Sequence, residues 1–296
     1  MAWRDLSRPA PPPPEAADPP QDVRAALCVL ASGSTGNCTL LRVRDDAGRW
    51  TRTCLIDAGL SPTRTRRLLA ERGVAMGEID DIILTHLDTD HFYSGWRRVK
   101  DCRATLRLHR RHVGRGERSG VLMRRTEPFH EPVELAEGFE FDPALLSHDD
   151  LGVAVFRFAF PCGATLGFAT DVGKPTEAMI DHLRGVDVLA IESNYCPEMQ
   201  LASGRPAMLK QRIMGGSGHL SNEQCVKTVR QIGPGSDVVL LHLSRQCNTP
   251  SLAAEPHEGS PYRLTVTSHD TPTDWIWIRA GGDTVPRSLF EAAAEG

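Results

Sequence analysis

The chain has 296 residues, of which 40% are hydrophobic and 24% charged, a composition typical of folded globular proteins. No apolar run reaches the roughly 18 residues that a membrane span needs, so we expect no membrane role. The N-terminal segment 1–23 is rich in proline and has no apolar core, which predicts a disordered tail rather than a secretory signal. We therefore expect a cytoplasmic protein with one folded domain over 24–296.

Short strands separated by tight turns dominate the first part of this domain. Period-two patterns and turn residues predict strands at 25–30, 38–44, 51–56 and 81–85. A helix is expected over 62–72, because Pro62 suits its first turn and Gly73 its end.

The second half alternates further strands with helical patterns. Strands are expected at 153–160, 164–169, 186–191, 237–243, 262–267 and 274–278. Helices are expected at 175–184 and 222–232, the second with a capping box of Ser221 and Gln224. Because strands outnumber helices, we expect two packed sheets with helices outside.

A basic stretch over 97–125 interrupts a chain whose net charge is −4. It holds eleven Lys or Arg residues against two acids, a local net charge of +9. Clustered cations of this kind displace the counterions of nucleic-acid phosphates, although a solvated arginine-rich surface is the alternative. Within or beside it, Trp96 could stack a base but more often packs, and His109 and His112 suit surface or polyanion contacts better than metal ligation.

Four potential metal ligands follow the strand predicted over 81–85 within six residues: His86, Asp88, Asp90 and His91. Residues two apart in an extended segment point the same way, so His86 and Asp88 can share one cation. Asp90 and His91 can then turn toward a second cation. Two hydrogen-bonded histidines and two turn aspartates are the purely structural alternative, and the density of ligands argues against it.

The segment 85–91 resembles the HxHxDH motif of the metallo-β-lactamase superfamily, with Asp88 in place of its second histidine. Residues that follow or end predicted strands are similar to its other motif positions: Asp57, His148, Asp171 and His242. This resemblance, and not the periodicity, implies an α+β fold class with a four-layer αββα sandwich. Further segments at 32–37, 56–61, 210–222 and 242–250 resemble the WalJ/YycJ-like exonucleases, and ribonuclease J and tRNase Z are more distantly similar. Tyr195 and Cys247 stand where that family tends to have histidine and asparagine.

The resemblance implies two divalent ions, Zn²⁺ or Mn²⁺, with a bridging hydroxide as the nucleophile. One ion would be held by His86, Asp88 and His148. The other would be held by Asp90, His91 and His242. Asp171 would bridge them, Asp57 would orient the metal loop, and the extra carboxylate of Asp88 would favour harder ions such as Mn²⁺.

A histidine in a Gly-His segment of the ribonuclease J relatives implies that His219 contacts the scissile phosphate, which would make it catalytic beside Asp90. A structural histidine near a helix cap is the alternative. Backbone N–H groups at Ser221 and Asn222 suit a phosphate. Lys210 and Arg212 are candidate phosphate clamps or ordinary surface charges.

Together these features predict a di-metal phosphodiesterase or nuclease, and the resemblance implies a 5′ exonuclease on single-stranded DNA or RNA. Two other classes stay open. One is a hydrolase of a small phosphodiester, ester or thioester, because the same di-metal core serves many substrates. The other is a scaffold that has lost its metal along with the histidine at position 88, which the remaining ligand positions disfavour.

Overall fold

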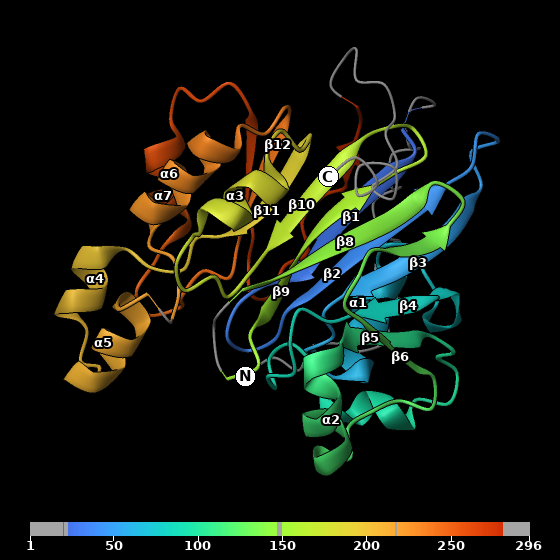
Figure 1. Cartoon of the computed structure of the whole chain (residues 1–296). Coiled ribbons are helices and arrows are strands. Elements are labelled where there is room, and N and C mark those ends of the chain that lie inside the picture. Colours follow the sequence, from blue (N-terminus) through green and yellow to red (C-terminus); the bar gives the residue numbers. More distant parts are fainter. Residues whose placement is uncertain (1–19, 21–22, 147–149, 217, 281–296) are drawn as a thin grey trace, which may run out of the picture.

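Two seven-stranded sheets pack face to face, with helices on their outer faces (Figure 1). The computed structural model describes residue 20 and residues 23–146, 150–216 and 218–280. Most of the proline-rich segment expected over 1–23 lies outside the described residues, as does His148. The αββα layering expected for the domain is confirmed.

The first sheet has the order β14-β1-β2-β3-β4-β5-β6. Its strands are β1 (Ala25–Ala31), β2 (Cys38–Arg44), β3 (Trp50–Ile56), β4 (Asp81–Ile83), β5 (Thr105–His109), β6 (Thr126–Phe129) and β14 (Ile276–Ile278). Strands β1 to β3 are antiparallel and β3 to β6 are parallel. The helical segments among them are α1 (Pro62–Ala70), η1 (Met76–Glu78), η2 (Ser94–Arg98), η3 (Arg110–His112) and α2 (Val113–Ser119).

The second sheet has the order β13-β12-β11-β10-β9-β8-β7, and it too has antiparallel strands, β7 to β10, followed by parallel strands, β10 to β13. Its strands are β7 (Val133–Ala136), β8 (Phe139–Leu146), β9 (Val153–Ala159), β10 (Thr165–Ala169), β11 (Val188–Glu192), β12 (Asp237–Leu241) and β13 (Arg263–Val266). The associated helices are α3 (Glu177–Leu183), α4 (Pro197–Ala202), α5 (Ala207–Met214), α6 (Asn222–Ile232), α7 (Pro250–Ala254) and η4 (Glu255–His257). Within the described ranges, no helix has the length and apolar character that crossing a membrane requires.

The core lies in three apolar layers. Between the sheets, phenylalanine rings pack edge to face, as where the centroids of Phe129 and Phe141 lie 5.2 Å apart. The outer face of the first sheet buries a second layer under α1, which includes Leu68 and Leu69. A third layer lies under α3 and α6 on the second sheet. These layers fix the strand ends on which the site is built.

The basic stretch over 97–125 is only partly exposed, whereas the sequence suggested one exposed surface. It contains β5 and α2, which the patterns did not predict; β6, β7, β8, α4 and α5 were also missed. His109 and His112 are buried, so the expectation of surface contacts is wrong for both. Trp96 is fully buried and its Nε1 donates to the carbonyl of Leu60 at 3.1 Å, which confirms the packed role.

Candidate metal centre

The site residues lie where strands of both sheets end. Asp57 follows β3, Asp171 follows β10 and His242 follows β12, and all three have left-handed backbone, with φ of 59°, 52° and 56°. Non-glycine residues rarely adopt this conformation, which costs roughly 1–2 kcal/mol each. Such strain is concentrated at functional sites, where it turns the chain to present a side chain.

Asp57 organises the metal loop, residues 86–91, which carries His86, Asp90 and His91. Its carboxylate accepts hydrogen bonds from the backbone N–H and the hydroxyl of Thr85, at 2.9 Å each, and lies 2.7 Å from Nδ1 of His91. Because Nδ1 of His91 is held in this way, Nε2 is turned to Asp171, 2.7 Å from Oδ2. The geometry is that of a carboxylate that orients a metal-binding histidine.

The same loop is also bound to the backbone after β3. The N–H of Ala58 donates to the carbonyl of His91 at 2.7 Å, and that of Asn37 donates to Asp90 at 2.7 Å. Gly59 permits this approach, since a Cβ at that position would lie 1.8 Å from the carbonyl oxygen of Asp90. The position of the metal loop therefore depends on the missing side chain of Gly59.

We expect Gly59→Ala to lower the free energy of unfolding by about 3 kcal/mol, because the new methyl group meets backbone that cannot rotate away. Denaturant unfolding measures the loss, and elemental analysis should show reduced metal content. Gly204→Ala is the matched control, because nothing lies within 4 Å of a Cβ there. Equal stability of the two variants would contradict the role given to Gly59.

Several pairs of side-chain atoms in the site lie too far apart for a strong hydrogen bond and have the spacing of two ligands of one metal ion. Nε2 of His86 lies 3.4 Å from Oδ2 of Asp171, and Oδ2 of Asp90 lies 3.8 Å from Nε2 of His91 and 3.7 Å from that of His242. Two ligands about 2 Å from one tetrahedral ion stand about 3.3 Å apart. Nε2 of His242 is buried and has no hydrogen-bond partner among the described residues. The residues therefore fit divalent cations.

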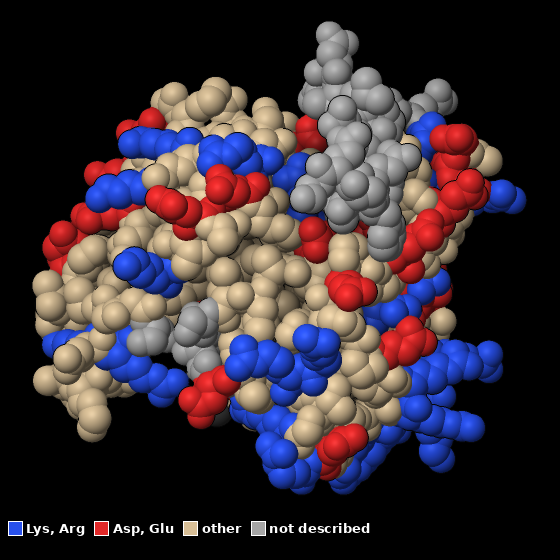
Figure 2. Space-filling model, viewed as in Figure 1, with Lys and Arg blue, Asp and Glu red and all other residues tan. Residues whose placement is uncertain are grey.

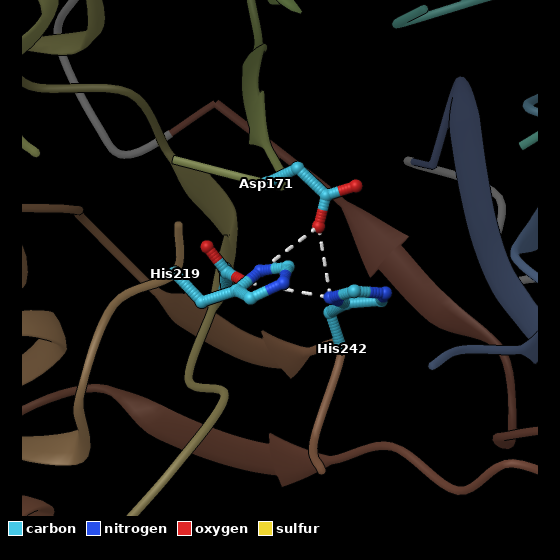
Figure 3. Close-up of side chains that lie close together, drawn as sticks. Asp171, His219 and His242 are labelled. Atoms are coloured by element: carbon cyan, nitrogen blue, oxygen red, sulfur yellow. Dashed lines mark hydrogen bonds and ion pairs between the residues drawn. The ribbon is translucent and has the colours of Figure 1, made fainter. Parts of the chain in front are cut away.

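Asp171 faces both His219 and His242 (Figure 3). Oδ1 of Asp171 is 2.9 Å from Nδ1 of His242 and 3.3 Å from Nδ1 of His219. Burial alone would raise the pKa of Asp171, but His242 and His91 hold it well below its usual range. Conversely, burial lowers the pKa of His91, and Asp57 and Asp171 outweigh this and raise it well above the usual value. A site with these carboxylates favours positive charge, whether protons or metal ions.

Asp88, the residue that departs from the motif, divides its two oxygens between two partners. Oδ2 lies 3.7 Å from Nε2 of His86, and Oδ1 lies 2.8 Å from Nη2 of Arg115 on α2. One oxygen is therefore placed beside the histidine, while the guanidinium of Arg115 offsets part of the added negative charge. The arrangement is consistent with a carboxylate ligand for the cation at His86.

Glu192, at the end of β11, was missed by the sequence analysis. Its Oε1 lies 2.6 Å from Nδ1 of His219 and 3.3 Å from Nδ1 of His242, and the backbone N–H of Val172 donates to its Oε2 at 2.8 Å. The carboxylate is fully buried. Its position after the predicted strand 186–191 was a signal of the same kind as that of Asp171 and could have identified it.

The loop 32–37 also contributes to the site, although its sequence predicted only a family resemblance and no site residue. The hydroxyl of Ser32 accepts a hydrogen bond from the backbone N–H of His242 at 2.8 Å. Nδ2 of Asn37 lies 3.0 Å from Nε2 of His91. The loop thereby connects ligands from the two sheets.

The candidate phosphate-binding residues are placed less favourably. The ammonium group of Lys210 donates to the carbonyl of Leu201 at 2.5 Å, which joins α5 to α4, and Arg212 is exposed on α5. Ser221 caps α6 through the predicted capping box with Gln224. The N–H of Asn222 donates to the carbonyl of Tyr195 at 2.9 Å. A phosphate at the start of α6 would have to displace these bonds.

Comparison with known proteins shows wide similarity to one superfamily. Residues 52–243 match the family model of the β-lactamase superfamily domain. The exodeoxyribonuclease WalJ of Streptococcus pneumoniae is 27% identical over 262 residues, covering 83% of this chain and 95% of that protein. The exodeoxyribonuclease YycJ of Bacillus anthracis is 27% identical over 237 residues, covering 76% and 84%.

The fold is also found among solved structures. The Zn²⁺-bound PqqB of Methylobacterium extorquens superposes with a TM-score of 0.63 and 16% identity, covering 84% of this chain and 99% of that one. At this level of identity the likeness concerns the fold alone.

Proposed function

The chain belongs to the metallo-β-lactamase superfamily of hydrolases, and from this premise we propose that it is a di-metal phosphodiesterase that degrades nucleic acid. The finer proposal is a 5′ exonuclease on single-stranded DNA or RNA. It is supported by the similarity to WalJ and YycJ, which are named exodeoxyribonucleases.

One observation carries the proposal: carboxylate and imidazole groups from both sheets converge with ligand spacing. Three groups of side chains could each hold an ion within the described residues: Asp90, His91 and His242; His86, His91 and Asp171; Asp171, Glu192, His219 and His242. Asp88 is proposed to complete the second group with His148, which lies outside the described residues. Two divalent cations here would lower the pKa of bound water toward neutral pH and would stabilise negative charge on the phosphoryl oxygens.

The remaining chemistry belongs to groups of the chain itself. Asp57 holds His91 in one orientation, and Glu192 does the same for His219. Burial lowers the pKa of His219, but Glu192 and Asp171 outweigh it and raise that pKa to about 9. Because Glu192 and Asp171 both lie against Nδ1, the ring is held in one orientation, in which it can donate a hydrogen bond or a proton to the oxygen that leaves phosphorus. We assign this role to His219.

The proposal is tested by metal analysis of the purified protein, followed by assays on labelled single-stranded DNA, on RNA and on bis(p-nitrophenyl) phosphate. A nuclease should degrade at least one of the two polymers. A 5′ exonuclease should release the label of a 5′-labelled strand as a mononucleotide. Activity on the small diester with no degradation of either polymer would instead support the small-substrate hydrolase. Absence of bound metal and of any hydrolysis would support a scaffold.

The metal preference can be tested at Asp88. We expect Asp88→His to shift the ion that best activates the enzyme from Mn²⁺ toward Zn²⁺, because imidazole is a softer ligand than carboxylate. Titration of the metal-free protein with each ion measures the change independently of activity. Asp46→His serves as a control for the added histidine, because the Asp46 side chain is 99% exposed and pairs with Arg24. An unchanged metal profile would mean that Asp88 serves only as the partner of Arg115.

A further inference from the structure

A cationic pocket lies on the first sheet, outside the metal centre. It encloses a cavity of about 570 Å³. Six cationic residues line it: Arg97, Arg98, Lys100, Arg103, Arg124 and Arg125. Figure 2 shows that Lys and Arg side chains gather over the lower right of the molecule, where β5, β6 and α2 lie in Figure 1.

The pocket is separated from the metal centre by the length of β4. Arg103 lies two residues before the start of β5, and Thr105 of β5 pairs in parallel with Asp81 at the start of β4. The metal loop begins at the opposite end of β4, with His86. At about 3.3 Å per residue, these five residues place the two sites roughly 17 Å apart.

The positive charge of the pocket is not balanced by the protein. None of the described residues that line it is an acid, and the acids nearest in sequence and in the sheet are already paired. Asp101 receives two bonds from Arg66, at 2.6 and 2.9 Å, and Asp81 and Glu127 are paired with Arg107. Within the described chain, Arg98, Lys100, Arg103 and Arg124 have no ion-pair partner. Clustered like charges of this kind are stabilised by a polyanion.

Two side-chain contacts link helix α2 to the pocket on one side and to the metal loop on the other. The guanidinium of Arg97 donates to the carbonyl of Gly120, at the end of α2, while Arg115 on the same helix pairs with Asp88. Between α2 and the metal loop lies a second cavity, of about 280 Å³, lined in part by Arg115 and Tyr93. Tyr93 is 45% exposed, unlike the buried Trp96. Exposed aromatic rings between cations are the usual means of binding single strands, through base stacking and phosphate contacts.

We propose that a single strand of nucleic acid entering the metal centre continues past Tyr93 into the cationic pocket, which serves as a second site for its phosphates. This inference rests on the proposed nuclease function and adds the path of the substrate. The six cations spread along one cavity suit a chain of phosphates better than a single anion. The pocket then determines how strongly long strands are preferred over short ones.

The test compares Arg98→Gln/Arg103→Gln/Arg124→Gln with a control that removes three positive charges elsewhere, Arg49→Gln/Lys227→Gln/Arg230→Gln. The substrates are a thymidine dinucleotide and a strand of about 30 nucleotides, longer than the 4–16 nucleotides one groove covers. In the pocket variant, the ratio of kcat/KM for the long strand to that for the dinucleotide should fall about tenfold or more. The log–log salt dependence of strand binding should flatten by about 0.7 for each phosphate that is no longer neutralised, roughly 2 for the three substitutions.

Tyr93→Leu gives a second measurement. Strands that carry 2-aminopurine near the 5′ end should be quenched on binding to the parent and less quenched on binding to this variant. Pocket and control variants with the same length preference and the same salt slope would overturn the proposal. The proposal would also be overturned if inorganic polyphosphate stabilised the pocket and control variants equally against thermal unfolding. Polyanions would then bind without the cations of the pocket. If the parent itself neither binds nor cleaves strands, the nuclease function fails instead.

Discussion

Replacing Asp171 by asparagine is expected to remove both cations and to lower turnover by roughly 1,000-fold or more. Asp171 lies within 3.4 Å of nitrogens of His86, His91, His219 and His242, so its charge serves every group of ligands around it. Divalent ions supply several kcal/mol of transition-state stabilisation, and each 1.4 kcal/mol changes the rate tenfold. Asparagine tolerates the left-handed backbone at this position, so the fold should persist.

Elemental analysis and hydrolysis of bis(p-nitrophenyl) phosphate measure the two effects of Asp171→Asn separately. Asp181→Asn is the matched control, because that carboxylate is exposed and pairs only with Arg184 among the described ion pairs. Retention of two ions per chain in the Asp171 variant would show that this carboxylate does not bridge them.

Replacing His219 by alanine is expected to lower turnover on nucleic acid by roughly 100-fold, in the range for a lost acid or transition-state donor. Glu192 and Asp171 engage Nδ1, so Nε2, on the opposite side of the ring, is the atom proposed to face the leaving oxygen. Esters of p-nitrophenol need little protonation of their leaving group. The loss should therefore be smaller on bis(p-nitrophenyl) phosphate than on DNA.

The metal content of His219→Ala separates two roles for this residue. His219 belongs to one of the groups that could hold an ion, together with Asp171, Glu192 and His242. Unchanged metal content with the expected difference between substrates supports proton donation. Loss of an ion, with equal losses on both substrates, would reassign His219 as a ligand. His182→Ala, on α3, where the ring contacts Asp142 of β8, controls for removal of a partly buried histidine.

Elements with a strong local pattern were predicted closely. Strand β2 and helix α6 have the predicted bounds, because alternation marks the first and the Ser221 capping box marks the second. Strand β5 was missed because Arg107 interrupts its apolar residues. The charge is accommodated by Asp81 and Glu127 on the neighbouring strands, which no local pattern reveals. Strand β8 was missed because it contains Pro143, which normally argues against a strand away from a sheet edge.

The site could be anticipated where its ligands are close in sequence. His86, Asp90 and His91 lie together after one buried strand, and the structure brings their side chains together with Asp171 and His242. Glu192 has the same strand-end signal as Asp171, but it was matched to no motif position, and its contact with His219, 27 residues away, appears only in the fold. The basic stretch was read as one surface because charge alone does not show that Arg107 is paired inside the sheet while Arg98 and Arg124 line a cavity.

The origin of the ligands in two separate sheets has a thermodynamic consequence. His86, Asp90 and His91 follow strands of the first sheet, whereas Asp171 and His242 follow strands of the second. An ion bound by both groups acts as a reversible cross-link, and it is bound tightly only while the sheets keep their native separation. Cation affinity and cohesion of the two sheets are then linked quantities. Any change that loosens the phenylalanine-rich layer between the sheets should weaken ion binding, even though no ligand is altered.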